Sequence, residues 1–385
     1  MFNCKPPGGR PTLGGFQRIA WALLMPCLIQ AAPVQAECSR QWMPEANLNV
    51  PRHGGGACVT PRGDIYVIGG RSGVPRTRAV ERLAFDGTQY ATSWQQLSPM
   101  PTPERDNFAL ACTSGFLYVI GGGSDSDPVL STVYRYDVLN DSWSTDAIPA
   151  ISVARGGAAA AVDGWGRIWV VGGWNVSNAS EKSVEIFDPG RPSTQWAAGP
   201  SLNVARDSHG LVVDRRGTMW ALGGSSNNSL LNSVESIDAG LSVLAGTWTT
   251  PVPAIPNPLS QTDYGVLGAD GQIYIAGGWL PGFSSRVLRF DPMTALCETC
   301  TPMSQPMNHV RLVLGKNNRV FRIGGEPSIG YSSASVESLD TGQFCAASGT
   351  VPAVSGTGLA VFSIFILAAG AIVMRTRRLR TMVQE

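Results

Sequence analysis

A hydrophobic hexapeptide that ends in two glycines recurs along this chain at a nearly constant interval. It reads IYVIGG at 65–70 and returns in similar form at 117–122, 168–173, 219–224, 273–278 and 320–325. The first glycines of successive pairs are separated by 52, 51, 51, 54 and 47 residues. A period near fifty residues is typical of repeat architectures, so we expect each copy to be one supersecondary unit that packs on its neighbours.

Each unit carries further strand signals. The hexapeptide follows a run of small residues and precedes a second apolar strand that ends in Asp, as in VEIFD (184–188) and VESID (234–238). Four short strands per unit, with almost no helical pattern, predict an all-β protein whose units are the radial blades of a β-propeller. A Trp and a Pro-rich link then follow in most units, the Trp residues being Trp94, Trp143, Trp196 and Trp248.

These residues resemble the kelch repeat, in which a Gly pair follows a hydrophobic strand and a Trp comes later in the unit. The resemblance covers roughly residues 41–345 and occurs six times. It implies a six-bladed kelch β-propeller with four strands per blade. Unit five departs from the pattern because it has CETC (297–300) near the place of the Trp, and unit six has no Trp after VESLD (336–340).

The missing Trp of unit six indicates how the ring closes. The segment QWMPEANLNVPR (41–52) matches the ends of other units, such as WSTDAIPAISVAR (143–155). We therefore expect a strand around Trp42 to serve as the fourth strand of the last blade.

Eight cysteines raise the question of disulfides. Cys38 and Cys345 would lie in the same gap between strands of blade six, where we expect a disulfide that fastens the ring, with two unpaired thiols as the alternative. Cys297 and Cys300 form a Cys-x-x-Cys pair, for which we expect a local structural bridge, with a redox or metal-binding pair as the alternative. Two further cysteines, Cys58 and Cys112, occupy similar places in blades one and two and are interpreted as core packing or as a pair.

The N-terminal residues 1–36 have the features of a secretory signal peptide. The basic residues Lys5, Arg10 and Arg18 come before an apolar run, and the small-residue cleavage site VQA follows it and ends at Ala36. The propeller is predicted to extend over 37–345. Six cysteines would then remain after cleavage, an even number that suits an oxidising compartment.

The C-terminal part predicts membrane attachment. A linker (346–357) leads to an uncharged apolar stretch (358–374), which we interpret as a transmembrane helix, and to a basic tail (375–385) with four arginines. The positive-inside rule places this tail in the cytoplasm and the propeller outside it, in the periplasm or at the cell surface.

The order of motif, apolar span and arginine cluster also resembles bacterial exosortase-type sorting signals of the Ile-Pro-Thr-Leu kind. The motif region VPAVSGTGL (351–359) departs from them, because Ala353 and Val354 replace Thr and Leu and no Trp follows. A plain type I anchor is the alternative. If sorting applies, a transpeptidase-like sorting enzyme removes the tail.

Charge and residue spacing narrow the classes of partner. The segment 37–350 contains 22 basic and 27 acidic residues, so its net charge of about −5 argues against a nucleic-acid binder. The three histidines, His53, His209 and His309, show no metal-ligand spacing. We expect no metal and no cofactor.

Arginines at a repeated position are the candidate binding residues. Arg52, Arg105, Arg155 and Arg206 each lie 16 or 17 residues before the first Gly of their unit, and Arg311 lies near the same place in unit six. One hypothesis places them around a mouth of the central channel, where guanidinium groups would grip carboxylates of an acidic ligand. The other is that each arginine braces a neighbouring blade by bonding backbone carbonyls.

Two functions from different classes remain. The first is an exported, membrane-anchored or surface-sorted interaction module that recognises a protein, a peptide or a glycan. The second is a periplasmic sugar-acid mutarotase or epimerase, since six-bladed kelch proteins that resemble this one include sialic acid mutarotases. An enzyme would require a carboxylate or a His beside the arginines in a closed pocket.

Overall fold

A computed structural model describes residues 40–191, 195–240, 246–250, 254–256, 265–280 and 282–342. The chain divides into residues 1–36 and 37–385, and the propeller belongs to the second unit. The predicted signal peptide, linker, transmembrane helix and basic tail lie outside the described residues, as do Cys38 and Cys345. No helix in the described part of the chain is both long and apolar enough to cross a membrane.

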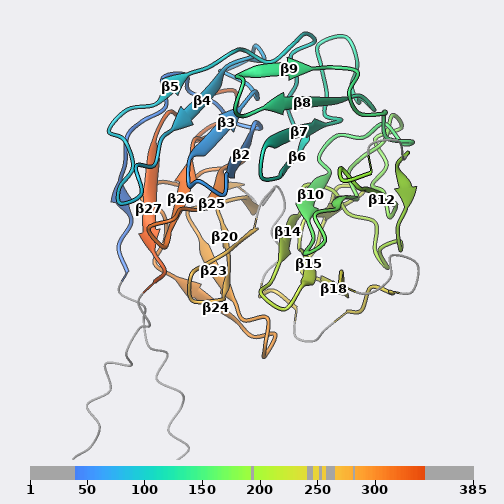
Figure 1. Cartoon of the computed structure of the whole chain (residues 1–385). Helices are drawn as coiled ribbons and strands as arrows, with labels where there is room; N and C mark the ends of the chain where they lie inside the picture. Colours follow the sequence, from blue (N-terminus) through green and yellow to red (C-terminus); the bar gives the residue numbers. More distant parts are fainter. Residues whose placement is uncertain are drawn as a thin grey trace, which may run out of the picture. The chain divides into compact units, whose positions relative to one another are not determined.

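The propeller unit consists of six antiparallel sheets arranged around a common axis, which confirms the predicted all-β, six-bladed architecture (Figure 1). The innermost strands of neighbouring blades contact one another around the whole ring. Blades one to three each contain four strands in chain order. Blade one contains β2 (Gly56–Val59), β3 (Ile65–Ile68), β4 (Val80–Leu83) and β5 (Gln95–Gln96). Blade two contains β6 (Ala109–Cys112), β7 (Phe116–Ile120), β8 (Val133–Asp137) and β9 (Ser142–Ser144). Blade three contains β10 (Ala159–Val162), β11 (Ile168–Val171), β12 (Val184–Phe187) and β13 (Ala197–Ala198).

Blades four to six show the same order with local changes. In blade four the fourth strand is reduced to one bridge between Ser236 and Thr249, and blades four and five each carry an extra hairpin between their second and third strands. Blade four contains β14 (Gly210–Val213), β15 (Thr218–Leu222) and β18 (Val234–Asp238), with the hairpin β16 (Ser225–Ser226) and β17 (Ser229–Leu230). Blade five contains β19 (Gly265–Leu267), β20 (Ile273–Ala276), β23 (Val287–Phe290) and β24 (Cys297–Cys300), with the hairpin β21 (Trp279–Leu280) and β22 (Gly282–Phe283). Blade six contains β25 (Arg311–Leu314), β26 (Arg319–Ile323), β27 (Val336–Asp340) and β1 (Met43–Pro44).

The recurring hexapeptide is the second strand of every blade followed by a turn that requires glycine. In blade one all four residues of β3 are buried. Gly69 and Gly70 then have φ angles of 55° and 93°, in the region that residues with a Cβ rarely adopt. A Cβ added to Gly70 would lie 2.4 Å from the carbonyl oxygen of His53. The Gly pair therefore lets the chain leave the strand while two backbone segments stay in close contact.

The ring closes as the sequence predicts. In blade six, β1 pairs antiparallel with β27, so that Met43 faces Ser338 and Pro44 faces Glu337. The last blade thus combines three strands from the end of the propeller with one from its beginning.

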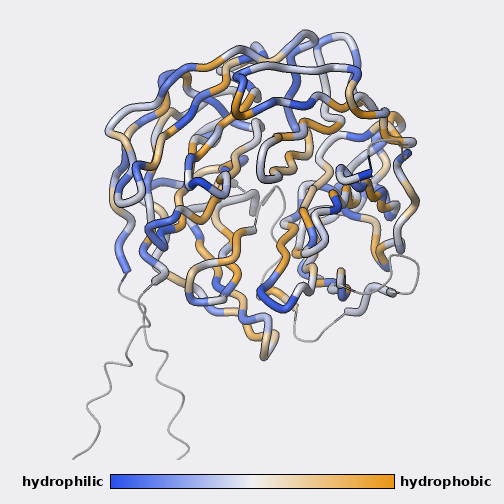
Figure 2. The backbone as a smooth tube through the Cα atoms, in the orientation of Figure 1, coloured by the Kyte–Doolittle hydropathy of each residue, from blue (hydrophilic) through white to orange (hydrophobic). Residues whose placement is uncertain are grey.

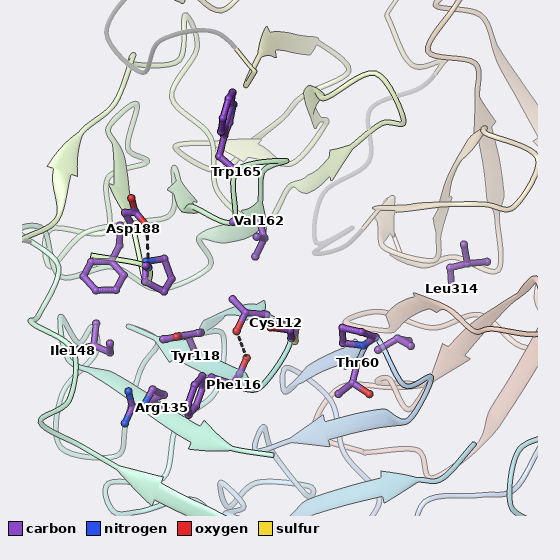
Figure 3. Close-up of a pocket in the computed structure, with 18 of the residues that line it drawn as sticks. Thr60, Cys112, Phe116, Tyr118, Arg135, Ile148, Val162, Trp165, Asp188 and Leu314 are labelled. Atoms are coloured by element: carbon purple, nitrogen blue, oxygen red, sulfur yellow. Dashed lines mark hydrogen bonds between the residues drawn. The ribbon is translucent and has the colours of Figure 1, made fainter. Parts of the chain in front are cut away.

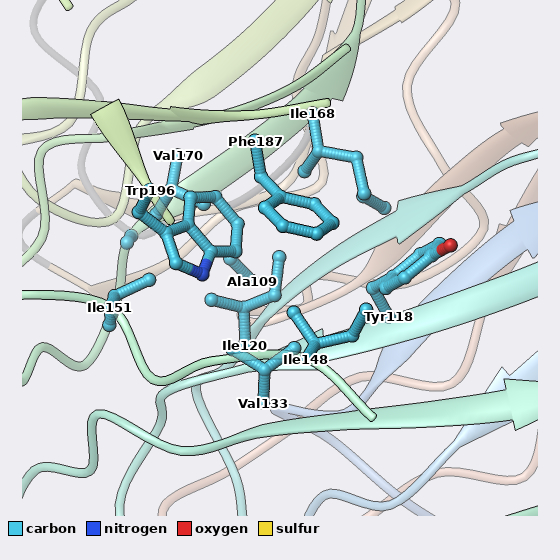
Figure 4. Packing of buried hydrophobic residues seen from close by; sticks show 12 residues of the cluster. Ala109, Tyr118, Ile120, Val133, Ile148, Ile151, Ile168, Val170, Phe187 and Trp196 are labelled. Carbon is cyan, nitrogen blue, oxygen red and sulfur yellow. The ribbon is translucent and has the colours of Figure 1, made fainter. Parts of the chain in front are cut away.

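Buried apolar side chains form six clusters, and each cluster lies between two neighbouring blades. The cluster between blades two and three includes Tyr118, Ile120, Ile168, Phe187 and Trp196 (Figure 4). Hydrophobic residues follow the strands, while the connections are more polar (Figure 2). Since burial of apolar surface is the main stabilising contribution in folding, each blade depends on both of its neighbours.

The Trp of the fourth strand ties consecutive blades together. Trp143 donates its indole N–H to the carbonyl oxygen of Ser98 in blade one at 3.0 Å. Trp42 does the same to Thr301 of blade five at 3.2 Å, which supplies the bond that the missing Trp of unit six would have made. Equivalent bonds run from Trp94 to Ala46, from Trp196 to Pro149 and from Trp248 to Pro200.

Cys58 and Cys112 form a disulfide that joins the inner strands β2 and β6 of blades one and two. The sequence left these two residues open between core packing and a pair, and the structure contains the pair.

The expected bridge between Cys297 and Cys300 is not formed, and both residues are free thiols. They mark the two ends of strand β24. Residues three apart in an extended strand point to opposite faces and lie roughly 10 Å from each other, too far for a disulfide. Burial raises the pKa of Cys297 to about 12 and that of Cys300 to about 11, so neither thiol is an activated nucleophile at neutral pH.

Candidate functional site

The repeated arginines lie inside the blades and not at a channel mouth. The exposed fraction of Arg52, Arg105, Arg155 and Arg206 is 2%, 0%, 1% and 0%. In blade three, Nη1 of Arg155 donates to the carbonyl oxygens of Gly172 at 2.9 Å and of Ser183 at 3.0 Å. These guanidinium groups are therefore buried and bonded by the protein itself through their Nη atoms, and they are not exposed to grip an acidic ligand.

A buried glutamate on the third strand completes this arrangement. Nη2 of Arg155 donates to Oε1 of Glu185 at 2.8 Å. The same carboxylate accepts bonds from the backbone N–H groups of Ser152 and Val153, in the link that enters the blade. Arg52 with Glu81 and Arg206 with Glu235 repeat the pair. The motif joins the link, the Gly turn and the third strand of one blade.

Blades two and six also contain a buried guanidinium group at this place, but different residues supply it or contact it. In blade two, Arg105 lies over the ring of Tyr134, 3.8 Å from its centroid. In blade six the guanidinium comes from Arg322 on β26, which bonds Gly324 and Glu337. Arg311 does not take this place. It is 4% exposed, and its Nε donates to the carbonyl oxygen of Gly55 in blade one.

The links that enter the blades and the connections between second and third strands form one end of the propeller, because neighbouring strands are antiparallel. At this end a chain of backbone bonds crosses from blade to blade. The N–H of Asn107 donates to Gly54, that of Gly157 to Asn107, and that of Ser208 to Gly157, at 2.7–2.8 Å. All four residues have positive φ angles. We call this the loop face.

A polar cavity of about 520 Å³ opens on the loop face. The indole of Trp174 forms part of its wall and rests on the backbone of blade three, where a Cβ on Gly157 would lie 1.9 Å from a ring carbon. Trp279 packs edge to face with Phe283, with ring centroids 5.2 Å apart. The other lining residues are mostly polar: Asn107, Asn178, Ser180, Asp207, Ser208, Ser225, Asn227, Asn228, Leu230 and His309.

The carboxylate of Asp207 is held by two hydroxyl groups at the edge of this cavity. Its Oδ1 accepts from Ser225 at 2.7 Å and its Oδ2 accepts from Ser180 at 2.5 Å. Among the described lining residues, Asp207 is the one carboxylate, and there is no arginine or lysine.

A histidine pair lies near the cavity where blade six meets blade one. The rings of His53 and His309 are 6.0 Å apart, and Nδ1 of His53 is 2.8 Å from Oγ of Ser332. Burial lowers the pKa of His53 to about 4, although the nearby Glu326 favours the protonated form. His53 is therefore neutral at physiological pH. No group of three or more metal-ligating side chains occurs in the parts of the chain that the structure describes.

A larger cavity of about 890 Å³ lies at the opposite end, where the turns between first and second strands meet. Its walls come from blades one, two, three and six. Figure 3 shows Arg135 beside Phe116 and Tyr118 on blade two, with Val162 and Trp165 from blade three and Leu314 from blade six. We call it the turn-face cavity. Most of its lining comes from the ends of the first strands and the turns that follow them, where the residue types differ from blade to blade.

Comparison with known proteins agrees with this geometry. The family model for the kelch motif matches residues 104–147, 154–203 and 262–304, which fall in blades two, three and five with the links before them. The chain carries kelch repeats.

Curated kelch proteins are similar to parts of this propeller. The chain is 29% identical to beta-scruin of Limulus polyphemus over 178 residues and 33% identical to Kelch-like protein 34 of Homo sapiens over 156 residues. These matches cover 43% and 37% of this chain, but only 18% and 23% of the relatives. The kelch propeller therefore spans a minor part of the length of the curated relatives it matches.

A solved structure shares the kelch propeller's fold. The structure of YjhT superposes with a TM-score of 0.63, at 17% identity, over 76% of this chain and 95% of that one. At this identity the likeness shows the fold alone.

Proposed function

We propose that this kelch propeller is an exported interaction module that binds a partner protein or peptide on its loop face. The observation that carries the proposal is a set of exposed apolar side chains on the connections between second and third strands. Val74, Val176, Ile329 and Tyr331 are 77%, 75%, 77% and 68% exposed. They project from blades one, three and six, at the end of the propeller where the polar cavity opens. Apolar groups grouped on one face of a soluble domain are typical of contact surfaces.

The polar cavity supports binding ahead of sugar-acid chemistry. A sugar acid would bring a negative charge beside Asp207, and the described lining contains no arginine or lysine to balance it. Trp174 and Trp279 suit contact with an aromatic side chain of a partner, and also with a sugar ring. A glycan ligand is therefore an outcome that the experiment below must separate from a protein ligand.

Two observations support export of the protein. The N-terminal residues 1–36 have the features of a signal peptide, and the bond between Cys58 and Cys112 suits an oxidising compartment. For the C-terminal residues we propose a membrane anchor over 358–374, with removal by a sorting enzyme as the alternative. The intact mass of the protein from its native host separates these two fates. A mass for 37–385 indicates a retained anchor, and a chain that ends near Val351 indicates sorting.

Site-specific photo-crosslinking tests the loop face. A photoreactive residue replaces Val176 in one variant and Leu139 in a matched control, since Leu139 is 82% exposed on a turn at the opposite end. We expect the first variant to form one dominant protein adduct in native cells and the control to form none. The proposal would be contradicted by equal adducts from both positions or by an adduct from Leu139 alone. A glycan conjugate without protein would contradict it as well.

A further inference from the structure

The turn-face cavity contains an arginine whose partner is missing. Repeat proteins offer an internal comparison, because each blade shows what the same position does elsewhere. In blade one, Arg82 is the third residue of β4 and forms an ion pair with Asp64 at 2.9 Å. In blade five the matching residue, Arg289, lies 3.5 Å from Asp270. Arg135 is the matching residue of blade two.

Arginines at this end of the other blades are paired as well. Arg167 with Asp163 in blade three and Arg216 with Asp214 in blade four are 2.6 Å and 3.0 Å apart. In blade six, Arg319 lies 3.7 Å from Glu45. Four blades therefore place a carboxylate from the turn between first and second strands against an arginine, and blade six takes its carboxylate from the residue after β1.

Blade two lacks this carboxylate. Its turn is Thr113–Ser114–Gly115, and Phe116, the first residue of the second strand, stands five residues before the first Gly of its pair, as Asp64 does in blade one. The guanidinium carbon of Arg135 lies 4.6 Å from the centroid of the Phe116 ring. The face of the Phe116 ring attracts the positive charge of the guanidinium. It has no lone pair that could accept a conventional hydrogen bond from any of the five N–H groups.

Arg135 makes no ion pair like those of the other blades in the described part of the chain, although its charge acts on Asp137, whose pKa is lowered mainly by its bonds to Asn140 and also by this arginine. Its Nε is shielded from solvent and makes no hydrogen bond. The nearest carboxylates are occupied elsewhere: Asp137 bonds Asn140, and Asp188 accepts from the N–H of Gly190 at 2.9 Å. A shielded Nε–H without an acceptor is unfavourable, and an incoming carboxylate would satisfy it with a charge-assisted bond.

The remaining walls of the cavity are apolar on the side of Arg135. Phe116, Ile148, Val162 and Phe187 come from blades two and three and line the same cavity as the arginine. The cavity volume of about 890 Å³ exceeds what a bare inorganic ion requires. The ligand that fits both features combines one carboxylate with an apolar body.

We propose that the turn-face cavity binds a small organic carboxylate with an aromatic or aliphatic body, and that Arg135 receives its carboxylate. The ligand carboxylate takes the place that Asp64 occupies in blade one. Its body rests on the apolar walls between blades two and three. This site lies at the end of the propeller opposite to the loop face, so it does not depend on the function proposed above.

Calorimetric titration of the full chain with three probes tests the proposal. Phenylacetate carries both features, phenylacetamide lacks the charge, and acetate lacks the apolar body. We expect phenylacetate to bind at least about tenfold more tightly than either of the others, which corresponds to one charge-assisted bond or a few buried methylenes. Equal affinity for phenylacetamide, or no saturable binding of phenylacetate, would overturn the proposal.

Three variants assign the effect to the residue. Arg135→Gln removes the cation, and Phe116→Asp installs the carboxylate that blade one has at this place. Both should weaken phenylacetate binding by about tenfold or more. Arg82→Gln changes the paired arginine of blade one and should leave binding unchanged. Since Arg135→Gln could perturb packing, thermal unfolding of each variant is measured beside the titration. A folded Arg135→Gln protein that binds like the unaltered chain would also overturn the proposal.

Discussion

Arg206 and Glu235 form an ion pair across 2.6 Å in which neither side chain is exposed to solvent. The arginine also bonds the carbonyl oxygen of Gly223, and the glutamate accepts from the backbone of Asn203. Removal of one partner would leave a buried charge without its counter-ion. Arg206→Met and Glu235→Gln are each expected to lower the free energy of unfolding by about 3–5 kcal/mol.

Chemical denaturation of the two single variants and of the double variant measures this coupling. The double variant should lose less than the sum of the single losses, because it leaves no unpaired charge. Strict additivity would show that the two residues stabilise the blade independently. Arg191→Gln is a suitable control, since this residue is largely exposed and its contact with Asp188 is 3.5 Å long.

Trp42 is expected to control closure of the ring. Trp42→Phe removes the indole bond to Thr301 and should cost about 1 kcal/mol, whereas Trp42→Ala also removes packing and should cost about 3 kcal/mol or more. Thermal unfolding measures both. Trp248→Phe breaks the same kind of bond between blade four and blade three, at 2.9 Å, and serves as the matched control away from the ring closure. No loss in Trp42→Ala would mean that the N-terminal strand does not stabilise blade six.

The disulfide between blades one and two should contribute strongly to stability. Cys58 and Cys112 are 54 residues apart, and the loop-entropy estimate for such a bridge is about 4 kcal/mol. The double variant Cys58→Ser/Cys112→Ser should therefore unfold at a lower denaturant concentration. Peptide mapping without reductant should recover the two cysteines as one linked species. Recovery of both as free thiols from the native host would contradict the bond and weaken the argument for export.

Acidification should destabilise the propeller through His53. The pKa of His53 is about 4 in the folded protein, against an ordinary value of 6.5. The unfolded chain therefore binds the proton more readily, and stability is complete above pH 6.5 and falls as the pH drops towards 4. The loss attributable to this group is up to about 3 kcal/mol. His53→Gln should flatten the stability profile between these pH values, and an unchanged slope would assign the effect to other groups.

The repeat architecture could be predicted from the sequence because the Gly turns recur as local signals. The closure through Trp42 could also be predicted, since the segment around it matches the ends of other units. The role of the arginines was open between a ligand grip and a brace. A signal that would have decided it is the glutamate in VERL, VEIF and VESID, which accompanies Arg52, Arg155 and Arg206 in their units.

Other features depend on geometry that the repeat pattern alone does not fix. The Cys-x-x-Cys pattern of Cys297 and Cys300 suggests a local bridge, but the residues lie in a strand that keeps them apart. The missing ion pair of Arg135 depends on which turn residue reaches the third strand, and the turns before β3 and β7 differ in length.

The pairing of β1 with β27 sets an order of events for synthesis. Met43 emerges from the ribosome almost 300 residues before Ser338, the residue that it faces in the finished ring. Throughout that interval the first strand has no partner. It is only two residues long, and one of them is Pro44, which has no N–H to offer to a wrong neighbour. The segment that completes the propeller is thus poorly suited to pair with anything before its own last blade arrives.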